Sequence, residues 1–166
     1  LQTTAVEMCG ELDQDLLAIT ASHTATQLSQ EHSVFAIDPS ATEAFKTIVD
    51  NAVSVTNTAV TNGTASQGNA LLAKEVIDEL VVQLSSATTV VGATEQLALL
   101  QAEMVKITAA RDAVYTDVGV AGAAVTAAHD AVEAARTTLG PAHHTLSWTK
   151  QLGTTEVDMA YSVATD

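Results

Sequence analysis

The sequence predicts an all-α fold, an elongated antiparallel helical bundle with long coiled-coil-like helices, in a single domain spanning residues 1–166. Apolar residues recur in alternating steps of three and four, which is the spacing of a heptad seam. Eight Gly and two Pro are too few for the many turns of a sandwich or barrel, although Thr and Val favour strands. Hydrophobic residues make up 47% of the chain and aromatic residues 3%, so a core of Ala, Val and Leu with closely spaced backbones is expected.

The first helix is predicted over about residues 3–35. Its seam holds two polar residues among apolar ones: Met8, Leu12, Leu16, Ile19, His23 and Thr26. Pro39 either ends this helix or kinks a longer one.

The next helix is expected to begin near residue 39. Asp38 before Pro39 fits an N-cap with proline at the first helical position, and Ser40 with Glu43 forms a competing capping box. The predicted seam of this helix is Ala41, Phe45, Ile48, Ala52, Val55 and Ala59. The residues from Thr61 to Gly68 concentrate turn-formers, and they predict a loop that reverses the chain.

The helical pattern resumes at Asn69, and Ser85 to Gly92 then weakens it with β-branched residues and a glycine. A continuous helix over 69–139 would span about 105 Å and lie antiparallel to residues 3–61. A break would instead give four shorter helices in an up-down bundle. The pattern favours the long helix because heptad spacing persists through Leu97, Leu100, Met104, Ile107, Arg111, Val114, Val118, Ala121, Val125, Ala128, Val132, Ala135 and Leu139.

Two features are predicted for the C-terminal part of the chain. Gly140 followed by Pro141 predicts the end of the long helix, because glycine commonly follows a helix and proline cannot continue it. A weaker final helix is expected over about residues 145–163.

Composition excludes several classes of function. Twenty acidic and six basic residues give a net charge of −14, which would repel a nucleic-acid backbone. A single cysteine, Cys9, excludes an intrachain disulfide and a cysteine-based zinc site. The sequence holds no apolar run of membrane-spanning length and no common nucleotide-binding, hydrolase, metalloprotease or EF-hand motif. We therefore expect no enzyme activity, no catalytic or metal site, no cofactor and no small-molecule substrate.

Two polar seam residues, His23 and Arg111, are candidates for fixing the register of the bundle. Arg111 should either extend its guanidinium to solvent or meet a carboxylate across the bundle. His129 with Glu133 has the spacing of a two-ligand metal grip, but such pairs arise often by chance. His143 and His144 are expected to form a solvated pair in a turn, and Cys9 to be an ordinary packed residue.

Asn62, Gly63 and Thr64 form an N-glycosylation acceptor. The predicted loop over 61–68 would expose it, although a plain turn asparagine is the competing interpretation. An accessible acceptor indicates a secreted or surface chain.

The acidic helical pattern of residues 3–139, rich in Ala, Thr and Val as between Val114 and Leu139, resembles the surface coat proteins of African trypanosomes. The nearest group is the glutamic acid/alanine-rich proteins of an insect stage. The resemblance implies a helical bundle anchored to the cell surface through a C-terminal glycolipid (GPI) and packed among neighbouring copies of itself. The chain departs from these families in having no Glu-rich tract and no paired cysteines.

The sequence therefore predicts a structural surface antigen, with Asn62 as its glycosylation acceptor, that forms a densely packed protective coat without catalysis. The alternative is a surface receptor or adhesin that binds a host or vector macromolecule through a bundle tip, at residues 61–68 or 140–147. An exposed apolar patch near a tip would favour the receptor.

Overall fold

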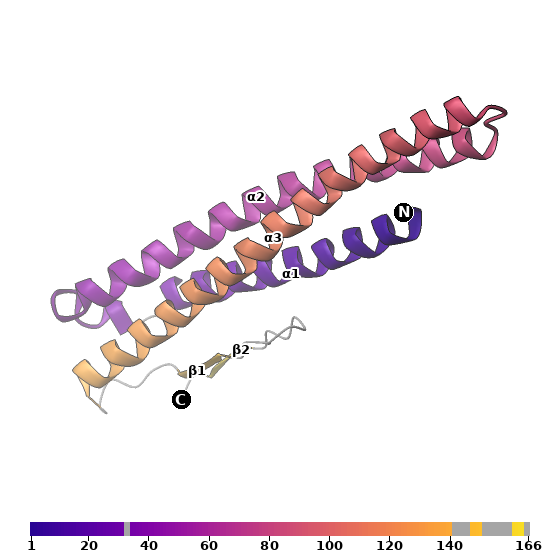
Figure 1. The fold of residues 1–166 in the computed structure, drawn as a ribbon. Helices are drawn as coiled ribbons and strands as arrows, with labels where there is room; N and C mark the ends of the chain where they lie inside the picture. Colours follow the sequence, from indigo (N-terminus) through magenta and orange to yellow (C-terminus); the bar gives the residue numbers. More distant parts are fainter. Residues whose placement is uncertain (32–33, 141–146, 151–160, 165–166) are drawn as a thin grey trace. The chain divides into compact units, whose positions relative to one another are not determined.

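The computed structural model describes residues 1–31, 34–140, 147–150 and 161–164 (Figure 1). Three long helices pack against one another, which confirms the all-α prediction. In chain order the elements are α1 (Gln2–Glu31), the short 3-10 helix η1 (Val34–Ala36), α2 (Pro39–Ser85), α3 (Val90–Leu139), β1 (Ser147–Lys150) and β2 (Tyr161–Ala164).

The chain forms two compact units, and each contains a segment of all three helices. The first unit consists of Leu1–Leu16 and Asn62–Thr116, and the second of Leu17–Thr61 and Asp117–Asp166. The prediction of a single domain stays a prediction.

In the first unit, α1 and α2 run antiparallel. Gln2 donates a hydrogen bond to Asp78 at 2.7 Å, and Gln67 donates one to Asp13 at 2.8 Å. Residue numbers therefore fall along α2 as they rise along α1.

The second unit has the same antiparallel order. His23 lies 3.0 Å from Thr56 through Nδ1 and Oγ1, and Gln30 donates to Asp50 at 2.9 Å. Long antiparallel helices with a heptad seam were thus predictable, although their boundaries were only partly so.

The seam of α2 follows heptad spacing over nearly the whole helix. Its buried members are Thr42, Val49, Ala52, Thr56, Ala59, Gly63, Ala70, Ala73, Ile77 and Leu80. Three predicted members, Ala41, Ile48 and Val55, are wrong because they fall outside this spacing: Ala41 and Ile48 are exposed and Val55 is half-buried. Phe45, also half-buried, keeps the spacing between Thr42 and Val49. Threonine takes two of the true positions because its hydroxyl bonds within the helix or across the seam while its methyl group packs.

The predicted loop over 61–68 is wrong, because α2 passes through these residues without a break. Gly63 is buried in the seam although it has no side chain to pack there. The Thr61 hydroxyl bonds back to the Asn57 carbonyl at 3.0 Å, and Gln67 bonds across to α1. Packing of the seam overrides the low helix propensity of these residues.

The chain reverses instead at residues 86–89, so the continuous helix over 69–139 and the four-helix alternative are both wrong. The last turn of α2 tightens as the Ser86 amide donates to the Gln83 carbonyl at 3.2 Å. Thr89 then caps α3, because its hydroxyl accepts from the Gly92 amide at 3.1 Å.

Other helix ends agree with their sequence signals. Asp38 is the N-cap of α2: its carboxylate accepts from the Ala41 amide at 3.1 Å and the Ser40 hydroxyl at 2.9 Å. Pro39 is therefore the first helical residue, and α1 ends earlier, at Glu31. Gly140 follows α3 with a left-handed φ of 81°, which a residue with a Cβ rarely adopts.

The predicted helix over about 145–163 is wrong in its described parts. Strands β1 and β2 pair antiparallel, with Trp148 opposite Val163 and Lys150 opposite Tyr161. Aromatic and β-branched residues favour this conformation.

The seams of α1 and α3 largely confirm the prediction. Met8, Leu12, Ile19 and Thr26 are buried on α1. The buried members on α3 are Leu100, Ile107, Val114, Ala121, Val125, Ala128, Val132 and Ala135. Leu97 was predicted in the seam but is 43% exposed.

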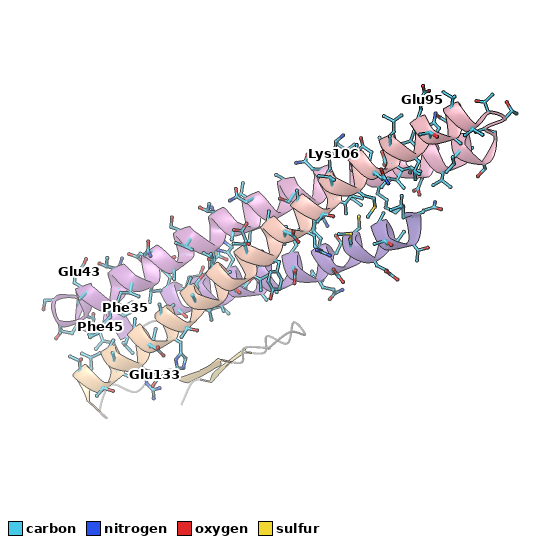
Figure 2. All side chains as sticks on the ribbon, viewed as in Figure 1. Phe35, Glu43, Phe45, Glu95, Lys106 and Glu133 are labelled. Carbon is cyan, nitrogen blue, oxygen red and sulfur yellow. The ribbon has the colours of Figure 1, made fainter. Side chains whose placement is uncertain are left out.

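Small side chains fill the core of the second unit, as the composition predicts. Val34 and Phe35 of η1 belong to one buried cluster with alanines from all three helices. Phe45 packs against this cluster (Phe35 and Phe45 are labelled in Figure 2). The alanines are Ala25, Ala52, Ala128, Ala131 and Ala135. Each alanine side chain occupies little volume, which favours close spacing of the helix backbones.

The corrected register of α2 can be tested with adjacent residues. Val49→Ala should reduce the free energy of unfolding by about 2 kcal/mol, because Val49 is fully buried and its loss removes two methyl groups and leaves a cavity. Ile48→Ala should cost less than about 0.5 kcal/mol, since Ile48 is exposed and alanine favours helix. Urea unfolding measures both, and the opposite order would support the predicted seam.

Candidate functional site

A hydroxyl-rich polar layer lies in the seam of the second unit. His23 Nδ1 and Thr26 Oγ1 each lie 3.0 Å from Thr56 Oγ1. Thr26 also donates to the His23 carbonyl at 2.9 Å, and Thr56 to the Ala52 carbonyl at 2.8 Å. His23 is half-buried on the seam, as predicted. Its role in fixing the register stays a prediction.

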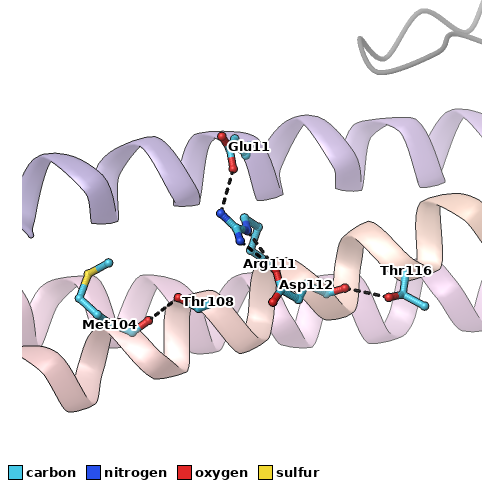
Figure 3. Close-up of polar contacts among 6 residues, drawn as sticks. All are labelled: Glu11, Met104, Thr108, Arg111, Asp112 and Thr116. Carbon is cyan, nitrogen blue, oxygen red and sulfur yellow. Dashed lines mark hydrogen bonds and ion pairs between the residues drawn. The ribbon is translucent and has the colours of Figure 1, made fainter.

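In the first unit, Arg111 forms ion pairs with carboxylates (Figure 3). This is one of the two alternatives predicted for its side chain. Its guanidinium lies 2.9 Å from Asp112 on α3 and 3.4 Å from Glu11 on α1. The Arg111 side chain is 32% exposed and both carboxylates are 62% exposed, so water screens these ion pairs. Arg111 thus links α1 to α3 with a small contribution to stability.

Asp15 lies near this cluster, and its carboxyl pKa is raised above the ordinary value. Burial is the larger cause and the charge of Glu11 adds to it, while Arg111 opposes both. A raised pKa means that the folded state disfavours the ionised carboxylate, so Asp15 destabilises the fold at neutral pH.

Asp15→Asn should therefore raise the melting temperature at pH 7. Its advantage should shrink as the pH falls through the raised pKa of the folded state. It should vanish below about pH 3.9, the ordinary aspartate value, where the wild-type carboxyl is protonated in both states. Thermal melts across this pH range make the measurement. Glu7→Gln, an exposed charge loss on the same helix, is the control; an equal gain there would contradict the assignment to Asp15.

His129 and Glu133, whose spacing would suit two metal ligands, each contact another side chain. His129 Nδ1 lies 3.2 Å from Asp130 Oδ1, whereas Glu133 accepts from Arg136 at 2.8 Å. Within the described ranges, no group of three or more His, Cys, Asp or Glu side chains is placed to hold a metal ion. His143 and His144 lie outside the described residues.

Cys9 is an ordinary packed residue, as predicted. Its sulfur lies 3.9 Å from the Ala70 carbonyl oxygen. Burial, with a smaller effect from Asp13, raises the pKa of the thiol. A buried thiol with a raised pKa is a poor nucleophile.

Sequence reasoning missed a groove of about 530 Å³ between α2 and α3 of the first unit. Its lining is mainly apolar, with Leu72, Val76 and four alanines, and Ser66 and Asn69 add polar atoms. Lys106 and Glu103, paired at 2.6 Å, are the charged residues of its lining. In the sequence, Leu72 and Val76 directly precede the seam residues Ala73 and Ile77. Large apolar residues next to the seam are the signal that could have revealed the groove. Such a lining suits an apolar surface more than a polar small molecule.

Asn62 is exposed, as a glycosylation acceptor must be, but it lies on α2 rather than in the predicted loop. Glycosylation of Asn62 stays a prediction.

Among the helices of the described residues, none has both the length and the hydrophobicity needed to cross a bilayer. Comparison with protein-family models, curated proteins and solved structures finds no match to this chain.

Proposed function

We propose that this chain is a structural surface protein, one of many copies in a protective cell-surface layer, and that it has no catalytic activity. The observation that carries the proposal is the chemistry of its outward-facing threonines. Their hydroxyl hydrogens are used within their own helix, so these threonines offer acceptors rather than donors to solvent, on a surface that is negative overall.

Eight exposed threonines show this pattern. Each donates from Oγ1 to the carbonyl four residues earlier, at 2.9–3.1 Å: Thr24, Thr47, Thr58, Thr61, Thr94, Thr116, Thr137 and Thr138. What remains towards solvent is a methyl group and oxygen lone pairs.

The positive charges of the basic residues are likewise compensated within the chain, by ion pairs. All five basic residues whose side chains the structure describes form ion pairs with acidic side chains: Lys46, Lys74, Lys106, Arg111 and Arg136. The net charge of −14 therefore dominates the surface. A hydrated, acceptor-rich, negative surface repels anionic macromolecules and resists nonspecific adhesion.

Surface location is tested by raising antibodies to residues 1–166 and applying them to intact, unpermeabilised source cells. The proposal expects dense, uniform labelling, which phosphatidylinositol-specific phospholipase C should release if the anchor is a glycolipid. Labelling that needs permeabilisation would overturn the proposal.

The passive role is tested by exposing immobilised protein to plasma or insect-gut extract. The coat predicts no stoichiometric retained partner. A matched variant with Thr24, Thr47, Thr58 and Thr61 changed to valine should retain more protein nonspecifically. Equal nonspecific adsorption by the wild-type protein and the valine variant would contradict the role given to the threonines. A partner that binds saturably would favour the receptor alternative.

The receptor alternative loses one of its predicted contact segments, because residues 61–68 lie inside α2 and form no tip. Of the second segment, 140–147, residues 141–146 lie outside the described residues. The feature that now favours a receptor is apolar: Val90 and Val91, 84% and 69% exposed, follow the turn at 86–89.

A further inference from the structure

The end of the α2–α3 hairpin lacks the core found elsewhere in the first unit. We call residues 81–99 the hairpin end. None of these residues is buried, whereas Ile77 and Leu80 before them and Leu100 and Ile107 after them are. Gln96 Oε1, although shielded from solvent, has no hydrogen-bond partner in the described part of the chain.

The cause is the number of helices. Gln2, the first residue of α1, bonds to Asp78, and the hairpin of α2 and α3 continues past it (Figure 1). Two helices enclose less interior than three, so apolar side chains remain in water. The large ones are Val82 (70% exposed), Val90 (84%), Val91 (69%), Leu97 (43%) and Leu99 (51%).

The hairpin end is also nearly free of charge. No charged residue occurs from Leu80 to Thr94, and Glu95 is the only one between Leu80 and Leu99. The chain as a whole carries a charge of −14, so two copies repel each other through most other surfaces.

We propose that two copies of this chain associate through their hairpin ends. Each copy contributes α2 and α3, and the four helices together bury the valines and leucines that one copy leaves exposed. The charge distribution restricts a second copy to this end: two chains that each carry −14 avoid facing charges only where both surfaces are uncharged, and residues 80–94 supply such a surface on each copy. The inference does not depend on a surface location, because it concerns the purified chain.

Sedimentation velocity of the purified protein, from micromolar to millimolar concentration, tests the association. We expect a concentration-dependent monomer–dimer equilibrium. Raising NaCl from about 0.01 M to 0.5 M should strengthen it, because salt screens the repulsion between acidic surfaces and leaves an apolar contact intact. A chain that stays monomeric throughout would overturn the proposal and leave the hairpin end to a different partner.

Charge substitutions locate the contact. Val82→Glu with Val91→Glu should weaken dimerisation at least about tenfold, because like charges would face each other across the contact. The matched control is Val105→Glu, an equally exposed valine on α3 outside the hairpin end (67% exposed), which should change the Kd little.

A mixing experiment distinguishes loss of the dimer contact from misfolding of the variant chains. A second chain with Val82→Lys and Val91→Lys should also dimerise poorly alone. Mixing it with the glutamate chain should restore association, now weakened by salt. Failure to restore it, or an equal effect of Val105→Glu, would overturn the proposal.

Discussion

Replacing Asn62 by proline should reduce the free energy of unfolding by about 3 kcal/mol or more. Asn62 lies in the middle of the 47-residue helix α2. Proline there removes the hydrogen bond from its own amide, and its ring clashes with the carbonyl four residues earlier. Urea unfolding monitored by circular dichroism measures the loss. A loop over 61–68 would tolerate the change, so a cost below about 0.5 kcal/mol would contradict a continuous α2.

Val90→Pro is the matched control for that substitution. Val90 is the first residue of α3, after the capping Thr89, and it is 84% exposed. Proline is favoured at the first helical position, where the amide has no partner within the helix. Its effect should be neutral or slightly stabilising, and a large loss there would contradict the turn at 86–89.

Enlarging Ala128 to leucine should cost about 3 kcal/mol. Ala128 is fully buried among other alanines in the core of the second unit. Three additional carbon atoms have no space there, so side chains must leave their preferred rotamers or the helices must separate. Thermal and urea unfolding measure the cost.

The neighbouring substitution Ala127→Leu provides the comparison, because Ala127 is exposed on the same helix turn and leucine is a good helix former. Its effect should lie within about 0.5 kcal/mol of zero. Equal tolerance of both leucines would show that the backbones in this core are not closely spaced.

Periodicity and end signals predicted much of the fold because they report local physics. The steps of three and four on α3 identified its buried face, and Asp38 and Gly140 marked true helix ends. These signals need no knowledge of the partner helix, since a buried stripe and a cap are properties of one helix.

The reversal of the chain was misplaced because turn-forming residues were weighed over the phase of the seam. Ala59, Gly63, Ala70 and Ala73 remain on one face through the supposed loop, which is the mark of an unbroken helix. Across 86–89 the phase does shift: extending the α2 seam in heptad steps would not place Leu100 in the core, where it lies.

Polar candidates were harder to assign than the fold. Thr42 and Thr56 were overlooked because threonine counts as polar in a hydrophobic pattern, yet both are fully buried. The groove beside Leu72 depends on how α2 and α3 are paired, which the sequence alone left open.

The assembly of both units from distant chain segments affects how the protein withstands proteolysis. A single cut between residues 61 and 62 would leave each fragment carrying part of both units, so neither fragment is a complete unit. Full separation would require cleavage near residues 16, 61 and 116 together. A nicked chain can therefore remain assembled through contacts between its pieces, and gel electrophoresis under denaturing conditions would reveal damage that a native gel does not.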